Sequence, residues 1–147
     1  MSKVTALYHI VFVTKNREMT IPQPNEEKLY RFIWSVIKSS GSSLLRIGGI
    51  ANHVHILLNL NPTTALSTLV RDIKSRSSRW IKLSGEFPHF TSWASEYYAS
   101  TIRFDEKSAV IEYINSQKKH HLGKSLDEEF GEMLRQSGYD YLPGDLR

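Results

Sequence analysis

The sequence predicts an α+β fold in which a ferredoxin-like antiparallel sheet carries helices packed against it. Three observations lead to this prediction. The chain has 147 residues, about the size of one domain, so we treat 1–147 as a single domain. Its hydrophobic content of 40% and charged content of 23% are those of a globular chain with a core. Its local patterns follow the order strand, helix, strand, strand, helix, strand, helix.

The first half of the chain supplies three strands and one helix. Residues 4–14 (VTALYHIVFVT) are rich in β-branched and aromatic side chains, which favour a strand. Residues 25–39 carry apolar side chains at helical spacing after two prolines, so they predict a helix. Residues 43–50 and 53–60 are apolar, alternating segments separated by a short break, which is typical of a β-hairpin.

The second half supplies the remaining elements. Residues 64–82 place apolar side chains along one side of a helix, which a glycine and a proline then close. Residues 95–103 (SEYYASTIR) predict the fourth strand. Asp105 is expected to be the N-cap of a helix that runs to about His121. A last short helix is expected over 126–136.

Composition excludes several classes of protein. No apolar run approaches the roughly 20 residues that a membrane helix needs, so we expect no membrane partner. The N-terminal residues lack the pattern of a secretory leader, so we expect a cytoplasmic location. The chain has no cysteine, which excludes disulfides, thiolate metal sites and a cysteine nucleophile. Any metal must therefore be held by histidine, carboxylate or amide groups.

Charge is distributed unevenly along a chain whose net charge is +4. Residues 71–82 (RDIKSRSSRWIK) hold five basic residues and one acid on the predicted helix. The side chains that we expect to bind a phosphate backbone are Arg71, Lys74, Ser75, Ser78, Arg79 and Lys82. A solvated basic face is an equal alternative on this segment alone. From Ser125 onward acids outnumber basic residues six to two, so 125–147 is expected to be a short helical, solvated tail that faces away from any polyanion.

The segment ANHVHILLNL (51–60) places two histidines in an apolar strand. Side chains two residues apart on a strand point to the same face, about 6 to 7 Å apart, so His53 and His55 can share one cation. A core role is the more common interpretation of such a short motif taken alone. A metal site therefore needs a third ligand from another part of the chain.

The segment VIEYINSQKKHH (110–121) offers that ligand and a nucleophile. Tyr113 and Gln117 are four residues apart, so they are adjacent on one face of the predicted helix. Alone they indicate a core-edge tyrosine with a hydrogen-bonding neighbour. Combined with two imidazoles, they suit phosphoryl chemistry, because a phenol with a pKa near 10 is a weak nucleophile until a cation activates the phosphate.

The motifs HVH (53–55), YINSQ (113–117) and KKHH (118–121) together resemble those of a known family. They are similar to the single-tyrosine HUH transposases (TnpA) of small bacterial insertion sequences, the IS200-like transposase family, including the relatives associated with repeated extragenic palindromes. The resemblance covers nearly the whole chain, including YHIVFVTKNR (8–17) and the basic segment 69–82.

The resemblance implies a metal-dependent enzyme. His53, His55 and Gln117 would bind a divalent metal, Mg²⁺ or Mn²⁺, and Tyr113 would be the catalytic nucleophile. In the family the tyrosine attacks single-stranded DNA next to a hairpin and forms a 5′-phosphotyrosine link, which is later reversed. Family members are homodimers in which the tyrosine helix of one subunit often completes the site of the other.

Two other functions compete with this one. A domesticated hairpin-DNA-binding protein would keep the basic helix but would not need Tyr113 or Gln117, and both are present. A metal-dependent phosphohydrolase that uses water would turn over without a covalent intermediate. His120 and His121 match the family pattern, and a helix-capping or core role is expected for them.

Overall fold

The computed structural model describes residues 2–142 and 146–147 of the chain. Its centre is one antiparallel sheet with the strand order β2-β3-β1-β4. The strands are β1 (Leu7–Thr14), β2 (Ser43–Ile50), β3 (His53–Asn59) and β4 (Trp93–Thr101). This order, with helices packed on the sheet, confirms the predicted ferredoxin-like fold.

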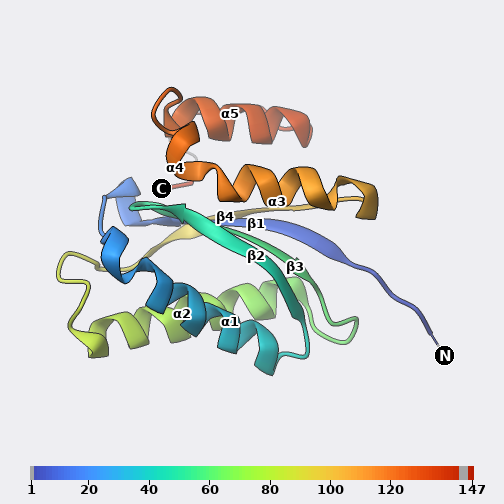
Figure 1. The fold of residues 1–147 in the computed structure, drawn as a ribbon, viewed down its shortest axis with the longest axis horizontal. Coiled ribbons are helices and arrows are strands. Elements are labelled where there is room, and N and C mark those ends of the chain that lie inside the picture. Colours follow the sequence, from blue (N-terminus) through green and yellow to red (C-terminus); the bar gives the residue numbers. More distant parts are fainter. Residues whose placement is uncertain (1, 143–145) are drawn as a thin grey trace.

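Two layers of helices cover the two faces of the sheet, as Figure 1 shows. One layer consists of α1 (Glu26–Ser39) and α2 (Leu66–Ser84). The other consists of α3 (Lys107–Asn115), α4 (Gln117–His120) and α5 (Leu126–Gln136). None of the helices in the described part of the chain is both long and apolar enough to cross a membrane.

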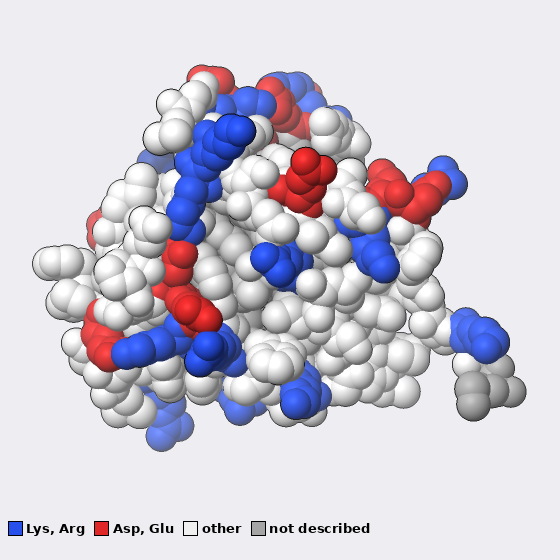
Figure 2. Space-filling model, in the orientation of Figure 1, with Lys and Arg blue, Asp and Glu red and all other residues white. Residues whose placement is uncertain are grey.

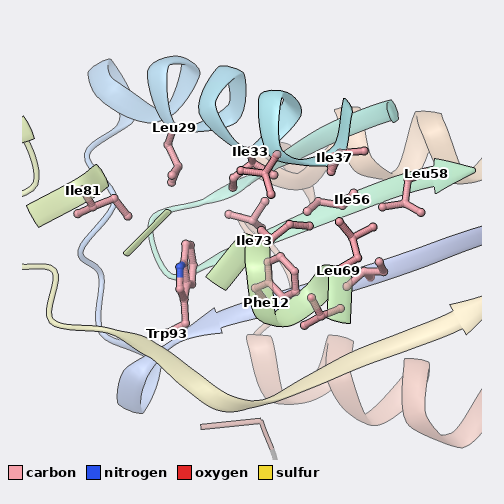
Figure 3. Close-up of a cluster of buried hydrophobic side chains, with 14 of the residues drawn as sticks. Phe12, Leu29, Ile33, Ile37, Ile56, Leu58, Leu69, Ile73, Ile81 and Trp93 are labelled. Carbon is pink, nitrogen blue, oxygen red and sulfur yellow. The ribbon is translucent and has the colours of Figure 1, made fainter. Parts of the chain in front are cut away.

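The main core lies between the sheet and the layer of α1 and α2 (Figure 3). Because strand side chains alternate between faces, Val54, Ile56 and Leu58 of β3 point into this core. The histidines of β3 consequently point to the opposite face, under α3, α4 and α5. A smaller apolar cluster on that second face includes Phe130 and Met133 of α5.

The helix predicted from Asp105 begins later and is interrupted. A 3₁₀ turn over 104–106 precedes α3, and Ser116 (φ −95°, ψ 10°) separates α3 from α4. The predicted N-cap is wrong, because Glu106 accepts the backbone N–H of Arg103 at 2.8 Å and closes the turn instead. Asp105 remains exposed and pairs with the Arg103 side chain.

The prediction of a solvated acidic tail is also wrong for α5. Ser125 Oγ caps this helix by accepting the N–H of Glu128, and the helix packs on the sheet. Phe130 is 0% exposed and Glu129 only 1%. The prediction relied on the excess of acids, which is a count over the whole segment. Such a count does not register that the apolar side chains recur every three to four residues and so form one face that can be buried.

Candidate active site

The two histidines of β3 form the floor of a buried polar cluster on the second face of the sheet. His53 and His55 are both 0% exposed, and their ring centroids lie 5.0 Å apart. Gln117, buried at the start of α4, places its Oε1 atom 2.9 Å from His53 Nε2. The structure thus brings all three side chains that were predicted as metal ligands to one point.

Glu129 of α5 is a fourth member of this cluster that the sequence analysis missed. Its Oε1 lies 2.9 Å from His55 Nε2, and its Oε2 lies 3.9 Å from His53 Nε2. Ligand atoms of His53, His55 and Glu129 all fall within 4.8 Å of one another, which is compatible with a shared metal ion. His121, at the end of α4, also contacts the Glu129 carboxylate.

Tyr113 stands at the edge of the same cluster. Its hydroxyl donates a hydrogen bond to Glu129 Oε1 at 2.5 Å, and its ring meets the His55 ring edge-on with centroids 5.5 Å apart. Gly48 of β2 allows α3 to approach so closely, because a Cβ there would lie 3.0 Å from Ile114. Tyr113 and the predicted ligands therefore lie together within one chain.

Two further buried side chains contact the far nitrogens of the histidine rings. His9 Nε2 of β1 lies 2.8 Å from His55 Nδ1. Asn52 Oδ1, in the turn before β3, lies 2.9 Å from His53 Nδ1. The sequence shows Asn52 beside the HVH motif, but no spacing rule connects His9 with His55. Their contact depends on the register that sets β1 beside β3.

Burial controls the ionisation of the cluster. It lowers the pKa of His53 to about 3, and the charge of His55 adds to this effect. Burial raises the pKa of Tyr113, and the Glu129 carboxylate raises it further. Burial also disfavours the charged form of Glu129, but the neighbouring His55 and His53 and the Tyr113 hydroxyl outweigh it and hold its pKa below the ordinary value. A neutral His53 imidazole thus faces a carboxylate.

These shifts predict that the metal-free protein loses stability in acid. The pKa values of His9 and His53 fall from 6.5 to about 3 on folding, so between these values the unfolded chain binds more protons. Their contribution is complete above pH 6.5 and is lost as the pH falls toward 3. Within that window, each of the two histidines should lower the free energy of unfolding by roughly 1.4 kcal/mol for every unit by which the pH falls.

Urea unfolding in EDTA at several pH values measures this effect. His9→Phe removes one titrating group and should make the pH dependence shallower. Equal unfolding free energies at about pH 7.5 and about pH 5 would contradict the prediction.

The donor set of the cluster fits a divalent cation. Among the described residues, four buried polar atoms of the cluster form no geometrically regular hydrogen bond, and they are His55 Nε2, Gln117 Nε2, His121 Nε2 and Glu129 Oε2. The nitrogens of His55 and His121 both lie against the Glu129 carboxylate. Buried groups in such a state are costly, and a cation bound by imidazole and oxygen ligands would satisfy them.

The predicted DNA-binding side chains lie in the other layer. On α2, Arg71, Ser75, Arg79 and Lys82 are exposed, while Lys74 and Ser78 are half-buried. The structure does not bring them to the histidine cluster, because the sheet lies between. Beside α2 is a cavity of about 340 Å³ lined by Arg71, Lys74, Ser75, Ser95 and Tyr97, among others.

Away from the cavity beside α2, the surface carries charges of both signs. On the face drawn in Figure 2, Lys and Arg side chains alternate with Asp and Glu over both helical layers. Ion pairs on the surface include Lys28 with Glu86 and Lys118 with Glu26. Such paired charges contribute little attraction for a polyanion, so the cations of α2, which form no ion pair with another described residue, are the better candidates for a phosphate contact.

Comparisons with known proteins point in one direction. The model of a family described as IS200-like transposases matches residues 2–117. The ISDra2 transposase TnpA of Deinococcus radiodurans is 21% identical over 117 residues, covering 75% of this chain and 82% of the relative. The resemblance drawn from the motifs is thereby confirmed for the family.

Solved structures share the fold. A crystal structure of a candidate transposase from Deinococcus radiodurans aligns with a TM-score of 0.62 at 21% identity, covering 80% of this chain and 95% of that one. A REP-associated tyrosine transposase bound to a REP hairpin aligns with a TM-score of 0.64 at 16% identity, covering 100% of this chain and 94% of that one.

Proposed function

The chain belongs to the IS200-like transposase family, and from this premise we propose that it cleaves and rejoins single-stranded DNA next to hairpins through a 5′-phosphotyrosine intermediate. One observation carries the proposal. The Tyr113 hydroxyl lies in the same buried cluster as His53, His55, Gln117 and Glu129, and this cluster has the donor atoms of a metal site.

Tyr113 is the nucleophile in this proposal. Its Oη attacks the scissile phosphorus and forms a phosphodiester, while the bond from phosphorus to the 3′ oxygen breaks. The 5′ end of one strand stays on the enzyme, and the other strand leaves with a free 3′-hydroxyl after its oxygen takes a proton from solvent. One diester replaces another, so the step is reversible and rejoining needs no external energy.

Glu129 takes the proton that Tyr113 must lose. Its Oε1 already accepts that proton in a hydrogen bond of 2.5 Å, and its lowered pKa keeps it ionised at neutral pH. His53, His55, Gln117 and Glu129 would hold Mg²⁺ or Mn²⁺. The bound metal would supply Lewis-acid polarisation of the scissile phosphate.

The test uses labelled hairpin DNA with a single-stranded flank, incubated with the protein and Mn²⁺ or Mg²⁺. We expect a protein–DNA adduct that survives SDS and is absent in EDTA. Metal-dependent cleavage without any adduct would indicate a phosphohydrolase that uses water. Hairpin binding without cleavage in either metal would indicate a domesticated binding protein.

The solvent-facing cations of α2 are proposed to hold the DNA backbone. The relative bound to a REP hairpin supports a hairpin as the ligand. Arg71→Ala combined with Lys82→Ala should weaken hairpin binding and reduce the slope of log K against log salt by about one unit per cation. Titrations by fluorescence anisotropy at several salt concentrations measure this slope.

A matched control removes two exposed cations from α1, where Lys28 and Arg31 are replaced by alanine. The control should keep the salt slope of the wild type, and neither variant should change metal affinity. Equal losses of affinity in both double variants would show that α2 contributes only general charge. The homodimer that the resemblance implies stays a prediction, and because the cluster lies within one chain, the proposed chemistry does not depend on it.

A further inference from the structure

The hydrogen-bond partners of the Asn52 side-chain amide determine which of its ends faces His53. Its Nδ2 donates to the backbone carbonyl of Arg17 at 3.2 Å, and a carbonyl can only accept, so the amide end facing it must be the NH₂ group. The backbone carbonyl of Asn52 accepts from the N–H and the hydroxyl of Thr14, which fixes the residue in place. Its Oδ1 must therefore face His53.

This orientation determines the tautomer of His53. Asn52 Oδ1 can only accept, so His53 Nδ1 carries the proton and His53 Nε2 carries a lone pair. That lone pair points at Gln117 Oε1, another acceptor, 2.9 Å away. An imidazole nitrogen and an amide oxygen at this distance are compatible with two ligands of one cation.

His9 contacts the far nitrogen of the His55 ring as Asn52 contacts that of His53. One of the two facing nitrogens, His9 Nε2 and His55 Nδ1, must carry a proton to make their 2.8 Å contact. The other nitrogen, His55 Nε2, lies 2.9 Å from the Glu129 carboxylate, to which it can donate a proton while no cation is bound. A cation bound at Nε2 requires the His55 proton to be on Nδ1, and His9 Nε2 is then placed to accept it.

We propose that Asn52 and His9 are positioning residues that hold the imidazoles of His53 and His55 in the Nδ1–H tautomer, with both Nε2 lone pairs directed at one divalent cation. The inference rests on the proposed metal site and deepens it. Outer partners of this kind fix the ring orientation of histidine ligands and raise their basicity, and their loss typically lowers metal affinity by about 10- to 100-fold.

Paired variants separate the hydrogen bond from packing. Asn52→Asp and His9→Gln keep an acceptor, whereas Asn52→Leu and His9→Phe fill similar volumes without one. Mn²⁺ affinity is measured by calorimetry and by the electron paramagnetic resonance signal of free Mn²⁺. We expect the Leu and Phe variants to bind about 10- to 100-fold more weakly, and the Asp and Gln variants to bind nearly as the wild type does.

A second readout does not depend on activity. Nitrogen-15 NMR of the imidazoles should show protonated Nδ1 and unprotonated Nε2 for His53 in metal-free wild-type protein, and for both His53 and His55 after Mg²⁺ is added. The opposite tautomer at either residue would overturn the inference, and so would equal Mn²⁺ affinity in all four variants. Equal weakening in all four variants would also overturn it, because packing would then explain the loss. The proposed metal site fails separately if wild-type protein shows the expected His53 tautomer but binds no Mn²⁺.

Discussion

Tyr113→Phe is expected to abolish the covalent protein–DNA adduct while leaving hairpin binding and Mn²⁺ affinity unchanged. The variant loses only the hydroxyl that forms the bond to phosphorus, and the ring keeps its edge-on contacts with His55 and His9. Loss of the hydrogen bond to Glu129 should alter the free energy of unfolding by no more than about 1.5–3 kcal/mol. SDS gels with labelled DNA measure the adduct, and mass spectrometry identifies the modified peptide.

Tyr139→Phe is the matched control, because Tyr139 is 66% exposed. It should form the adduct at the wild-type rate. If Tyr113→Phe forms as much adduct as the wild type, the nucleophile lies elsewhere and the assignment of Tyr113 fails.

His53→Ala should abolish metal-dependent cleavage and weaken Mn²⁺ binding by more than about 100-fold, beyond the loss expected for an outer partner. The imidazole is fully buried and supplies one of the donor atoms of the proposed metal site. Calorimetry with Mn²⁺ and the adduct assay measure both effects. His89→Ala, which removes an exposed histidine, should change neither.

The His53→Ala change also leaves a cavity and an unpaired Asn52 Oδ1, so part of its effect falls on stability. Both assays are therefore run well below the midpoint of thermal unfolding of the variant, with circular dichroism as a check on folding. Wild-type adduct formation with unchanged metal dependence in the folded variant would contradict the metal assignment.

The sequence predicts the histidine pair and its face from local rules. Alternation along β3 sends Val54 and Ile56 to one side and His53 and His55 to the other. Right-handed crossovers place the helices after β1 and β3 on a single face of the sheet. In the structure the basic helix α2 and the histidines therefore lie on opposite faces of the sheet, an arrangement that charge and spacing alone do not give.

The remaining members of the cluster depend on long-range contacts. Tyr113 and Gln117 stay near each other across the break at Ser116, so their spacing was informative even though the helix is not continuous. Glu129 could not be found this way, because it lies beyond the region that the family model matches, on a helix whose net charge suggests a solvated position. Only the docking of α5 on the sheet brings Glu129 next to the histidines.

The cluster draws on β1, β3 and three helices, and its side chains range from His9 to Glu129 in the chain. During synthesis, α5 leaves the ribosome after the elements that carry the tyrosine and both histidines. A nascent chain that ends before α5 contains the proposed nucleophile but lacks the carboxylate that accepts the tyrosine proton. The proposed DNA cleavage would then begin only after α5 has been synthesised and has docked on the sheet.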